Sequence, residues 1–287
     1  GFEFSVDEPG YSRVEARLIR GKETVCEGSD EIFAVKLDAS GISSDGSVAD
    51  SSGRVAAFLS SLGIRPAEYV SGTPSGDYLV VGEFEPQQWG SGMSDIMEWV
   101  YKGHTLIVVD KPERWAEYFA DKEVLDYRGS KKVGTAWYGG NYFNRAHPIW
   151  AGLPQDCVFN WEYQCFAAYN RRRVGLRCEN GETLAAVVAD HKKEVYSVLS
   201  LIRAGRGQVI LTSLDIPACI SDIHAPSQDS LREGDVVDGM YEALGTFDVS
   251  GENGANVVGQ QLLLNMMKLK NLWVLCGIRK VIPRNAS

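Results

Sequence analysis

Two uninterrupted apolar segments, separated by a helical pattern, constrain this chain more than any other feature. The first segment runs from Tyr78 to Gly82, and the second is the run Thr105 to Val109 within a predicted strand from His104 to Asp110. A strand that is apolar at every position is covered on both faces, which is typical of a parallel sheet. Between them, Ile96, Met97 and Val100 fall on one face of a helix. This alternation predicts right-handed βαβ units and an α/β fold with a doubly wound, mostly parallel sheet.

Further elements continue the alternation on both sides. Gly63 is a C-terminal cap for a predicted helix over residues 54–62. Pro112 suits the first turn of a helix over residues 113–120. Residues 124–170, rich in aromatic side chains and glycine, predict a long excursion with short strands. Strands are predicted at 174–177, 184–189, 195–202 and 208–216, and helices at 236–244 and 256–269.

The N-terminal residues have a different pattern. Val14, Ala16 and Leu18 alternate with charged residues, which predicts a half-buried strand. A turn at Gly21 and a second strand over 31–37 would follow. Two strands do not form a stable sheet alone, so they are either the end of a β-sandwich or an edge added to the next domain. Residues 39–53 have linker composition. We therefore expect a β-strand segment over 1–42 and an α/β domain over 43–287.

Composition excludes several classes of function. The 287 residues carry a formal net charge of −9, which argues against nucleic acid as a partner because phosphates require a basic surface. No run approaches the roughly 20 apolar residues of a membrane helix. The six cysteines and four histidines have no metal-ligand spacing, so neither a metal nor a cofactor is expected. The start at Gly1, without Met, favours a fragment of a longer protein.

Catalytic residues are hard to find in this sequence. Ligands gather at the C-terminal ends of parallel strands, where Glu83, Asp110 and Asp215 stand. These three carboxylates are weak catalytic candidates for a hydrolase or transferase with acid–base chemistry. The turn after the second apolar strand contains Lys111 and Pro112 but no Ser, Cys or Gly. A nucleophile elbow is therefore not expected there, because Pro112 and the missing glycines disfavour the strained turn.

Large aromatic side chains beside amides suggest a sugar-binding surface, because sugar rings stack on aromatic faces. The commoner fate of such rings is the core or an interdomain contact. A carbohydrate-binding module thus remains an alternative to a packing role. The candidate ligand-binding residues are Trp89, Trp137, Tyr138, Asn141, Trp161 and Glu162.

Several of these segments together resemble a known module. They are Gly140 to Phe143, His147 to Pro154, Asn160 to Gln164 and Gly205 to Ile216. Over roughly residues 45–270 the chain resembles the C-terminal class I glutamine-amidotransferase-like domain of bacterial family 2 glycoside hydrolases, which are β-galactosidase-like. Residues 11–37 look like the last strands of the β-sandwich that precedes this module.

The resemblance implies a flavodoxin-like topology and an accessory role. The Cys-His-Glu triad of active amidotransferases has no counterpart here, since the elbow falls near Asp110 and the late strand reads Thr212 to Asp215. The chain is therefore expected to be a non-catalytic part of a glycoside hydrolase. Its expected partners are other domains of a longer parent chain, with a carbohydrate or a second copy of the chain as open alternatives. A periplasmic or secreted location is favoured over the cytoplasm.

Overall fold

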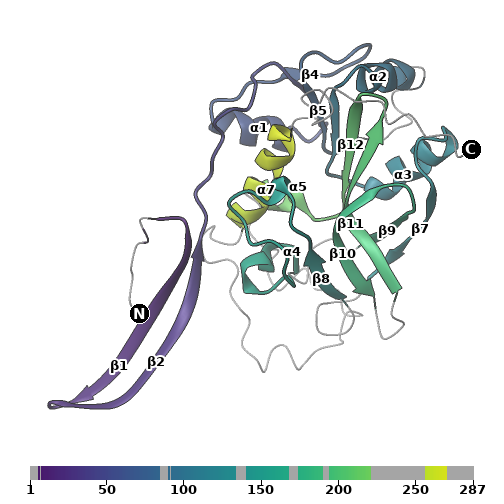
Figure 1. Cartoon of the computed structure of the whole chain (residues 1–287). Coiled ribbons are helices and arrows are strands. Elements are labelled where there is room, and N and C mark those ends of the chain that lie inside the picture. Colours follow the sequence, from purple (N-terminus) through teal and green to yellow (C-terminus); the bar gives the residue numbers. More distant parts are fainter. Residues whose placement is uncertain are drawn as a thin grey trace, which may run out of the picture.

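The computed structural model describes residues 6, 8–84, 90, 92–133, 140–167, 174–189, 194–220 and 256–269. These residues form an α/β body around a mixed 10-stranded sheet, and a separate two-stranded sheet projects from it (Figure 1). No helix in this described part is both long and apolar enough to cross a membrane.

One half of the large sheet is parallel. Its strands are β3 (Ser47–Ala49), β4 (Ala67–Glu68), β5 (Tyr78–Val81), β6 (Thr105–Val108) and β12 (Gly207–Thr212). They lie in the order β4-β3-β5-β6-β12, with every neighbouring pair parallel. If these five strands are numbered 1 to 5 in the order in which they occur along the chain, their order in the sheet is 2-1-3-4-5. The two apolar segments that predicted a parallel sheet are the neighbouring strands β5 and β6, each buried at every position.

Helices cover both faces of this parallel half. On one face α1 (Arg54–Ser61), α5 (Ile216–Ile220) and α7 (Asn256–Lys268) share a core with Val80, Ile107 and Ile210 of the strands. On the other face α2 (Gly92–Tyr101) and α3 (Pro112–Asp121) pack on Leu79 and Leu106. Strand residues therefore alternate between two cores, which explains why the strands are apolar throughout.

The other half of the sheet is antiparallel. Strand β12 pairs with β11 (Glu194–Ala204), which pairs with β10 (Glu182–Ala189), and β8 (Gly140–Asn144) is the edge. Strand β9 (Val174–Cys178) pairs with β11 and with β7 (Tyr127–Lys132). The prediction of an α/β fold is confirmed, and its parallel sheet is found in strands β4, β3, β5, β6 and β12, while the sheet as a whole is mixed. The β10–β11 and β11–β12 pairs are antiparallel because short turns join these sequential strands. The β8–β10, β9–β11 and β7–β9 pairs are also antiparallel, although these strands do not follow one another directly in the chain.

Strand β3 corrects the prediction of a linker over residues 39–53. Ser47 to Ala49 are buried between β4 and β5 in spite of their polar, glycine-rich surroundings. The Ser47 hydroxyl lies 3.1 Å from the Ser75 carbonyl oxygen, which satisfies its donor. Gly46 lies against the Tyr78 ring so closely that a Cβ atom there would be 2.2 Å from the ring. A three-residue strand with small residues carries too little periodicity to be recognised from sequence.

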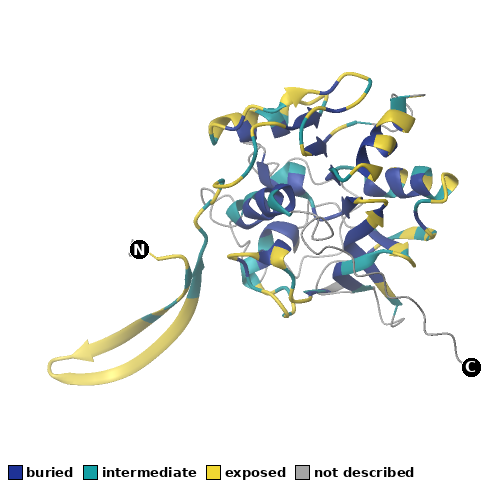
Figure 2. Cartoon of the chain, turned by 45° about the horizontal axis from the view of Figure 1, so that its top comes forward, coloured by how far each residue is buried: buried dark blue, intermediate teal, exposed yellow. Residues whose placement is uncertain are grey.

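The N-terminal hairpin consists of β1 (Gly10–Arg20) and β2 (Glu23–Ala34), which form a sheet of their own. The turn at Gly21 is confirmed, and Gly21 has φ 67°. Among the described residues, β1 and β2 pair with each other and not with the large sheet. The expectation of a half-buried β1 is wrong, since most hairpin residues are exposed, as the projecting ribbon in Figure 2 shows.

The base of the hairpin contacts the body. The Tyr11 ring lies 4.8 Å from that of Phe33, and the Tyr11 hydroxyl donates to Glu162 Oε1 at 2.6 Å. Glu162 belongs to the 3-10 helix η3 (Trp161–Tyr163). Further along, Asp38 N donates to Gln261 Oε1 at 2.8 Å, and Lys268 Nζ lies 2.6 Å from Asp38 Oδ2. Helix α7 therefore holds the segment that leads from the hairpin into the sheet.

Candidate functional site

The C-terminal edge of the parallel strands is the first place to look for a site. In a sheet of order 2-1-3-4-5, ligands bind at the switch point between the first and third strands, here β3 and β5. Asp50 follows β3 and Glu83 follows β5, so both lie at this switch point. Asp110 follows β6 and Asp215 follows β12. The topology thus brings four carboxylates to one edge.

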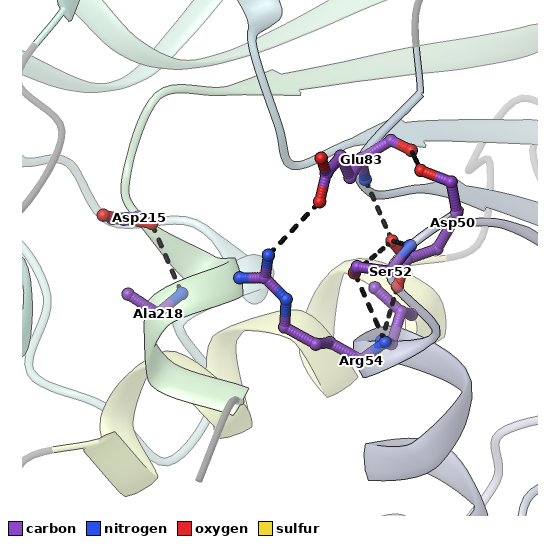
Figure 3. A network of polar contacts seen from close by, with 8 residues as sticks. Asp50, Ser52, Arg54, Glu83, Asp215 and Ala218 are labelled. Carbon is purple, nitrogen blue, oxygen red and sulfur yellow. Dashed lines mark hydrogen bonds and ion pairs between the residues drawn. The ribbon is translucent and has the colours of Figure 1, made fainter. Parts of the chain in front are cut away.

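Asp50 is the centre of a hydrogen-bond network at the switch point (Figure 3). Its Oδ1 accepts from Ser52 Oγ at 2.7 Å, Glu83 N at 3.0 Å and Ser52 N at 3.2 Å. Its Oδ2 accepts from Val55 N at 2.8 Å, at the start of α1. Glu83 N comes from the end of β5 and Val55 N from α1, while Asp50 itself follows β3. The Asp50 carboxylate, which accepts four hydrogen bonds in all, therefore links β3, β5 and α1.

Glu83 is engaged in the same way. Its carboxylate Oε2 accepts from Arg54 Nη2 at 3.2 Å, and its backbone oxygen accepts from Ser51 Oγ at 2.7 Å. Arg54 Nη2 and Glu83 Oε2 also form an ion pair between side chains that are more than a third exposed. Glu83, one of the predicted catalytic residues, therefore links the end of β5 to α1.

The backbone packs tightly at this point. A Cβ atom added to Gly82 would lie 2.7 Å from Asp50 Cγ. Glycine is therefore required between β5 and Glu83, because the Asp50 carboxylate fills the space where a side chain would stand. The cavity that remains has a volume of about 40 Å³. Its lining includes Asp50, Ser52, Arg54, Val55, Gly82, Glu83, Asp110 and Pro217.

A cavity of this size suits about one water molecule, whereas pockets for small molecules measure about 300–1,000 Å³. The structure thus brings Glu83 and Asp110 to one cavity, as the sequence suggested, but leaves no room for a substrate among the described residues. Asp215 is outside that lining, and its Oδ1 accepts from Ala218 N at 3.3 Å in α5 (Figure 3). Asp50 and Arg54 were not predicted, because β3 was not recognised.

The turn after β6 differs from its prediction. Lys111 lies in the left-handed region with φ 44° and ψ 50°, directly before Pro112 at the start of α3. Pro112 and the missing glycines were expected to disfavour a strained turn here, but the turn is present at Lys111. Proline disfavours the right-handed helical conformation in the residue before it, which helps place Lys111 outside that region. The strained geometry is present without a Ser or Cys.

The predicted ligand-binding residues have different fates. Trp89, Trp137 and Tyr138 lie outside the described residues. Asn141 is part of β8 and pairs with Val188. Trp161 and Glu162 are half-buried in η3, next to the hairpin base.

The neighbouring rings form a core. Trp150 and Phe159 have ring centroids 6.0 Å apart, and Phe159 and Tyr163 have centroids 4.1 Å apart. Trp150, Tyr163 and Phe166 are buried, and they pack against α7 in the larger core cluster. For these residues the interpretation as core is confirmed. Within the described part of the chain, no three His, Cys, Asp or Glu side chains gather as a metal site requires.

No family model matches this chain, and no curated protein matches it. Solved structures similar to it include an exo-β-1,4-mannosidase from Opitutaceae bacterium strain TAV5, with 13% identity and a TM-score of 0.36 over 57% of this chain and 26% of that one. A β-galactosidase from Bacillus circulans sp. alkalophilus has 13% identity and a TM-score of 0.35, over 58% of this chain and 26% of that one.

A cytoplasmic protein from Salmonella typhimurium LT2 has 12% identity and a TM-score of 0.33, over 70% of this chain and 83% of that one. The chain spans about a quarter of the length of the mannosidase and the B. circulans β-galactosidase.

Proposed function

We propose that this chain is a non-catalytic accessory part of a glycoside hydrolase, with a flavodoxin-like, amidotransferase-like fold, and that it packs against other domains of a longer protein. The strand order 2-1-3-4-5, with helices on both faces, supports the fold. The sequence resemblance to the C-terminal module of family 2 glycoside hydrolases supports the context.

The hydrogen bonds and the ion pair that the strand-end carboxylates make within the chain support the non-catalytic part of the proposal. An acid or base must reach a proton of the substrate at hydrogen-bond distance. Asp50 accepts four hydrogen bonds from its own chain, and Glu83 is paired with Arg54. The cavity beside them has about 40 Å³. These groups stabilise the sheet edge and leave no space for a glycosidic bond.

The β1–β2 hairpin supports the packing part. Ser12, Val14, Ala16 and Leu18 of β1 lie opposite Ile32, Asp30, Gly28 and Cys26 of β2, so together they form one face of the ribbon. This face is mostly small or apolar, and Leu18 is 64% exposed. The opposite face carries the ion pairs of Arg17 with Glu15 and with Glu27. A two-stranded ribbon exposed on both faces is only marginally stable in water. Its exposed apolar face is therefore typical of a surface that another protein or domain covers.

The size of this apolar face favours a tethered domain over a free partner. Eleven residues of strand are about 35 Å long, and two strands are about 10 Å wide, which gives a face of about 350 Å². A stable interface between separate proteins needs about 800 Å² from each partner. A domain linked in the same polypeptide has a high effective concentration, so a smaller interface suffices. We therefore assign the hairpin face to a neighbouring domain of the same protein.

Activity measurements test the non-catalytic part. The purified chain is expected to release neither ammonia from glutamine nor phenol from aryl glycosides above the buffer rate. If it shows turnover, the variants Glu83→Gln and Asp110→Asn identify the source. Turnover that is lost in either variant would overturn the proposal in favour of a carboxylate site.

Hydrogen exchange tests the packing part. The hairpin amides are expected to exchange fast in this chain alone and slowly in the protein encoded by the complete reading frame. The amides of β6 serve as the internal control, because they are buried in both cases. Equal, fast hairpin exchange in both proteins would show that no domain covers the face.

A further inference from the structure

The outer edge of β1 is available for pairing. Among the described residues, β1 and β2 pair only with each other, so each has one edge without a partner strand. Such an edge presents backbone N–H and C=O groups that can pair with a strand of another chain. Natural edge strands are commonly blocked by proline, by lysine or by their shortness. Strand β1 has 11 residues without Pro or Lys, and its register shift, at Leu18 and Ile19, lies near the turn. It is therefore suited to accept a further strand.

The position of the body limits how two such hairpins can meet. The body lies at one end of the hairpin (Figure 1). Two hairpins paired edge to edge lie about 10 Å apart, because each strand is about 4.8 Å wide. Eight strands lie side by side in the body, so the body is much wider than this spacing. Hairpins that pointed the same way would bring the two bodies into the same space, and paired hairpins must therefore point in opposite directions.

This condition leaves three ways of pairing the edges. With opposed hairpins, β1 pairs with β1 of the second copy, or β2 with β2, in the antiparallel direction, because the two strands are related by a two-fold axis. Pairing of β1 with β2 of the second copy is parallel in this arrangement. Parallel pairing is slightly less stable per residue than antiparallel pairing. The symmetric arrangements are therefore favoured over the mixed one.

The charges of the two strands decide between the symmetric arrangements. Opposite charges that face each other across two strands are stabilising, and like charges are destabilising. Strand β2 has no basic residue and four carboxylates, which are Glu23, Glu27, Asp30 and Glu31. Two β2 strands would therefore repel each other. Strand β1 carries both signs on one face, with Glu15 between Arg13 and Arg17. Only β1 has a charge pattern that is complementary to a second copy of itself.

One register uses these charges fully. When the two-fold axis passes at Ala16, Arg17 lies opposite Glu15 of the second copy, and Glu15 lies opposite the second Arg17. On the other face, Val14 lies opposite Leu18 of the second copy. Leu18 is 64% exposed in the single chain, so this contact removes apolar surface from water. The register thus places two ion pairs on one face and two apolar pairs on the other.

The length of the hairpin fits the same register. With the axis at Ala16, Gly21 in the turn lies opposite Tyr11 of the second copy, at the base of its hairpin. Each turn therefore ends where the other body begins. An axis at Val14 would also bring opposite charges together, but it would carry each turn past Gly10 of the second copy, toward its body. The described hairpin thus has the length that the Ala16 register requires.

The charged groups are already in contact within the hairpin. Arg17 Nη2 lies 3.5 Å from Glu15 Oε2, and Arg17 Nε lies 3.6 Å from Glu27 Oε2. All three side chains are more than half exposed, and exposed ion pairs contribute little to stability. A guanidinium has several N–H donors and a carboxylate has two acceptor oxygens, so each group can also bind one of the second copy. The intermolecular ion pairs therefore add to the existing ones.

We propose that two copies of this chain form a weak dimer by antiparallel pairing of their β1 strands about Ala16, which joins two hairpins into one four-stranded sheet. Main-chain hydrogen bonds hold a strand added at an edge, so this contact does not need the area of an ordinary interface. The apolar faces of the two hairpins become one face of about twice the size. The dimer uses the edge of the ribbon, whereas the proposed interdomain contact uses its apolar face.

Sedimentation velocity of the whole chain at rising concentration tests this proposal. A reversible equilibrium between monomer and dimer is expected. Glu15→Lys places a cation opposite Arg17 of the second copy at two positions in the dimer. It is expected to raise the dissociation constant about tenfold or more. Glu27→Lys is the matched control, because it changes the net charge equally and also removes a partner of Arg17, but on the strand that lies away from the paired edge. It is expected to leave the dissociation constant unchanged.

A mixing experiment separates the register from general charge effects. Arg17→Glu is also expected to prevent self-association, because two carboxylates then face each other. Glu15→Lys and Arg17→Glu chains are expected to associate when mixed, since opposite charges again lie at every facing position. Glu27→Lys has the same net charge as Glu15→Lys but is expected to associate with Arg17→Glu more weakly. A mixed dimer also shows that both variants retain a folded hairpin.

Several results would overturn the proposal. They are a chain that stays monomeric, growth beyond the dimer with concentration, equal weakening by Glu15→Lys and Glu27→Lys, and no association in the mixture. Growth beyond the dimer would indicate open-ended pairing of β1 with β2. Hydrogen exchange of the hairpin, measured at concentrations where the chain is monomeric, tests the interdomain contact alone. The dimer and the proposed function therefore fail separately.

Discussion

The hairpin has long strands that are exposed, whereas the parallel half of the large sheet has short strands that are buried. Strands β1 and β2 have 11 and 12 residues and are almost wholly exposed, whereas β5 and β6 have four residues each and are fully buried. The short strands are held by neighbours on both sides and by helices on both faces. Length and regular pairing therefore do not make a strand stable, because the apolar area removed from water supplies most of the free energy.

The largest effect on stability is expected when leucine is replaced by alanine in the parallel half of the sheet and, for comparison, in the hairpin. Leu79→Ala in β5 removes a fully buried side chain, so it is expected to lower the free energy of unfolding by about 2–5 kcal/mol. Leu18→Ala in β1 removes a side chain that is 64% exposed and is expected to change it by less than about 0.5 kcal/mol. Urea unfolding monitored by circular dichroism measures both. Equal costs would refute the contrast between the regions.

A second pair compares two glycines. Gly82→Ala places a methyl group against the Asp50 carboxylate at the end of β5, which is expected to cost about 1–3 kcal/mol. Gly28→Ala in β2 meets no atom within 4 Å and is expected to be neutral or slightly stabilising, because alanine restricts the unfolded chain. Thermal unfolding of the two variants checks this. A silent Gly82→Ala would mean that the switch point has space for a ligand.

A third test concerns pH and a histidine of the body. Burial lowers the pKa of His147 in the folded state below that of the unfolded chain, about 6.5. The unfolded chain therefore binds the proton first as the pH falls. The stability that neutral His147 contributes is present above about pH 6.5 and is lost as the pH falls through the folded-state pKa.

Urea unfolding between pH 7.5 and 5 measures this loss. His147→Asn keeps an acceptor for Ile149 N and is expected to reduce the pH dependence, with little change at pH 7.5. His147→Ala removes the cap as well and is expected to cost about 1 kcal/mol at pH 7.5. A steeper pH dependence in His147→Asn than in the unsubstituted chain would contradict the assigned direction.

The smallest effect is expected where the two regions meet. Tyr11→Phe removes the hydrogen bond to Glu162 and is expected to cost less than about 1 kcal/mol, because the contact is exposed. Amide exchange near Gly10 and Phe33 is expected to become faster. Tyr196→Phe is the control, since Tyr196 donates to Glu194 at 3.0 Å within the body. If both variants change hairpin exchange equally, the Tyr11 contact does not anchor the hairpin.

Elements that bury a continuous segment were predictable from local sequence. The helix ended by Gly63, the strands β5 and β6 and the helix α7 agree with their predictions within a few residues. Strand β3 was not predictable, because Ser47 is compatible with burial only through its contact with Ser75, 28 residues away. The carboxylates Glu83 and Asp110 were predicted at one edge, but the position of Asp50 among four donors depends on that unrecognised strand.

By itself, the sequence determined which segments have an apolar face or an apolar interior, because hydrophobic periodicity follows from the geometry of each element alone. It also placed acidic residues directly after the parallel strands. Only the tertiary structure decided that these carboxylates bond to the sheet edge, that half of the sheet is antiparallel, and that the hairpin projects from the body. Those outcomes depend on pairings between residues far apart in the chain, which no local pattern encodes.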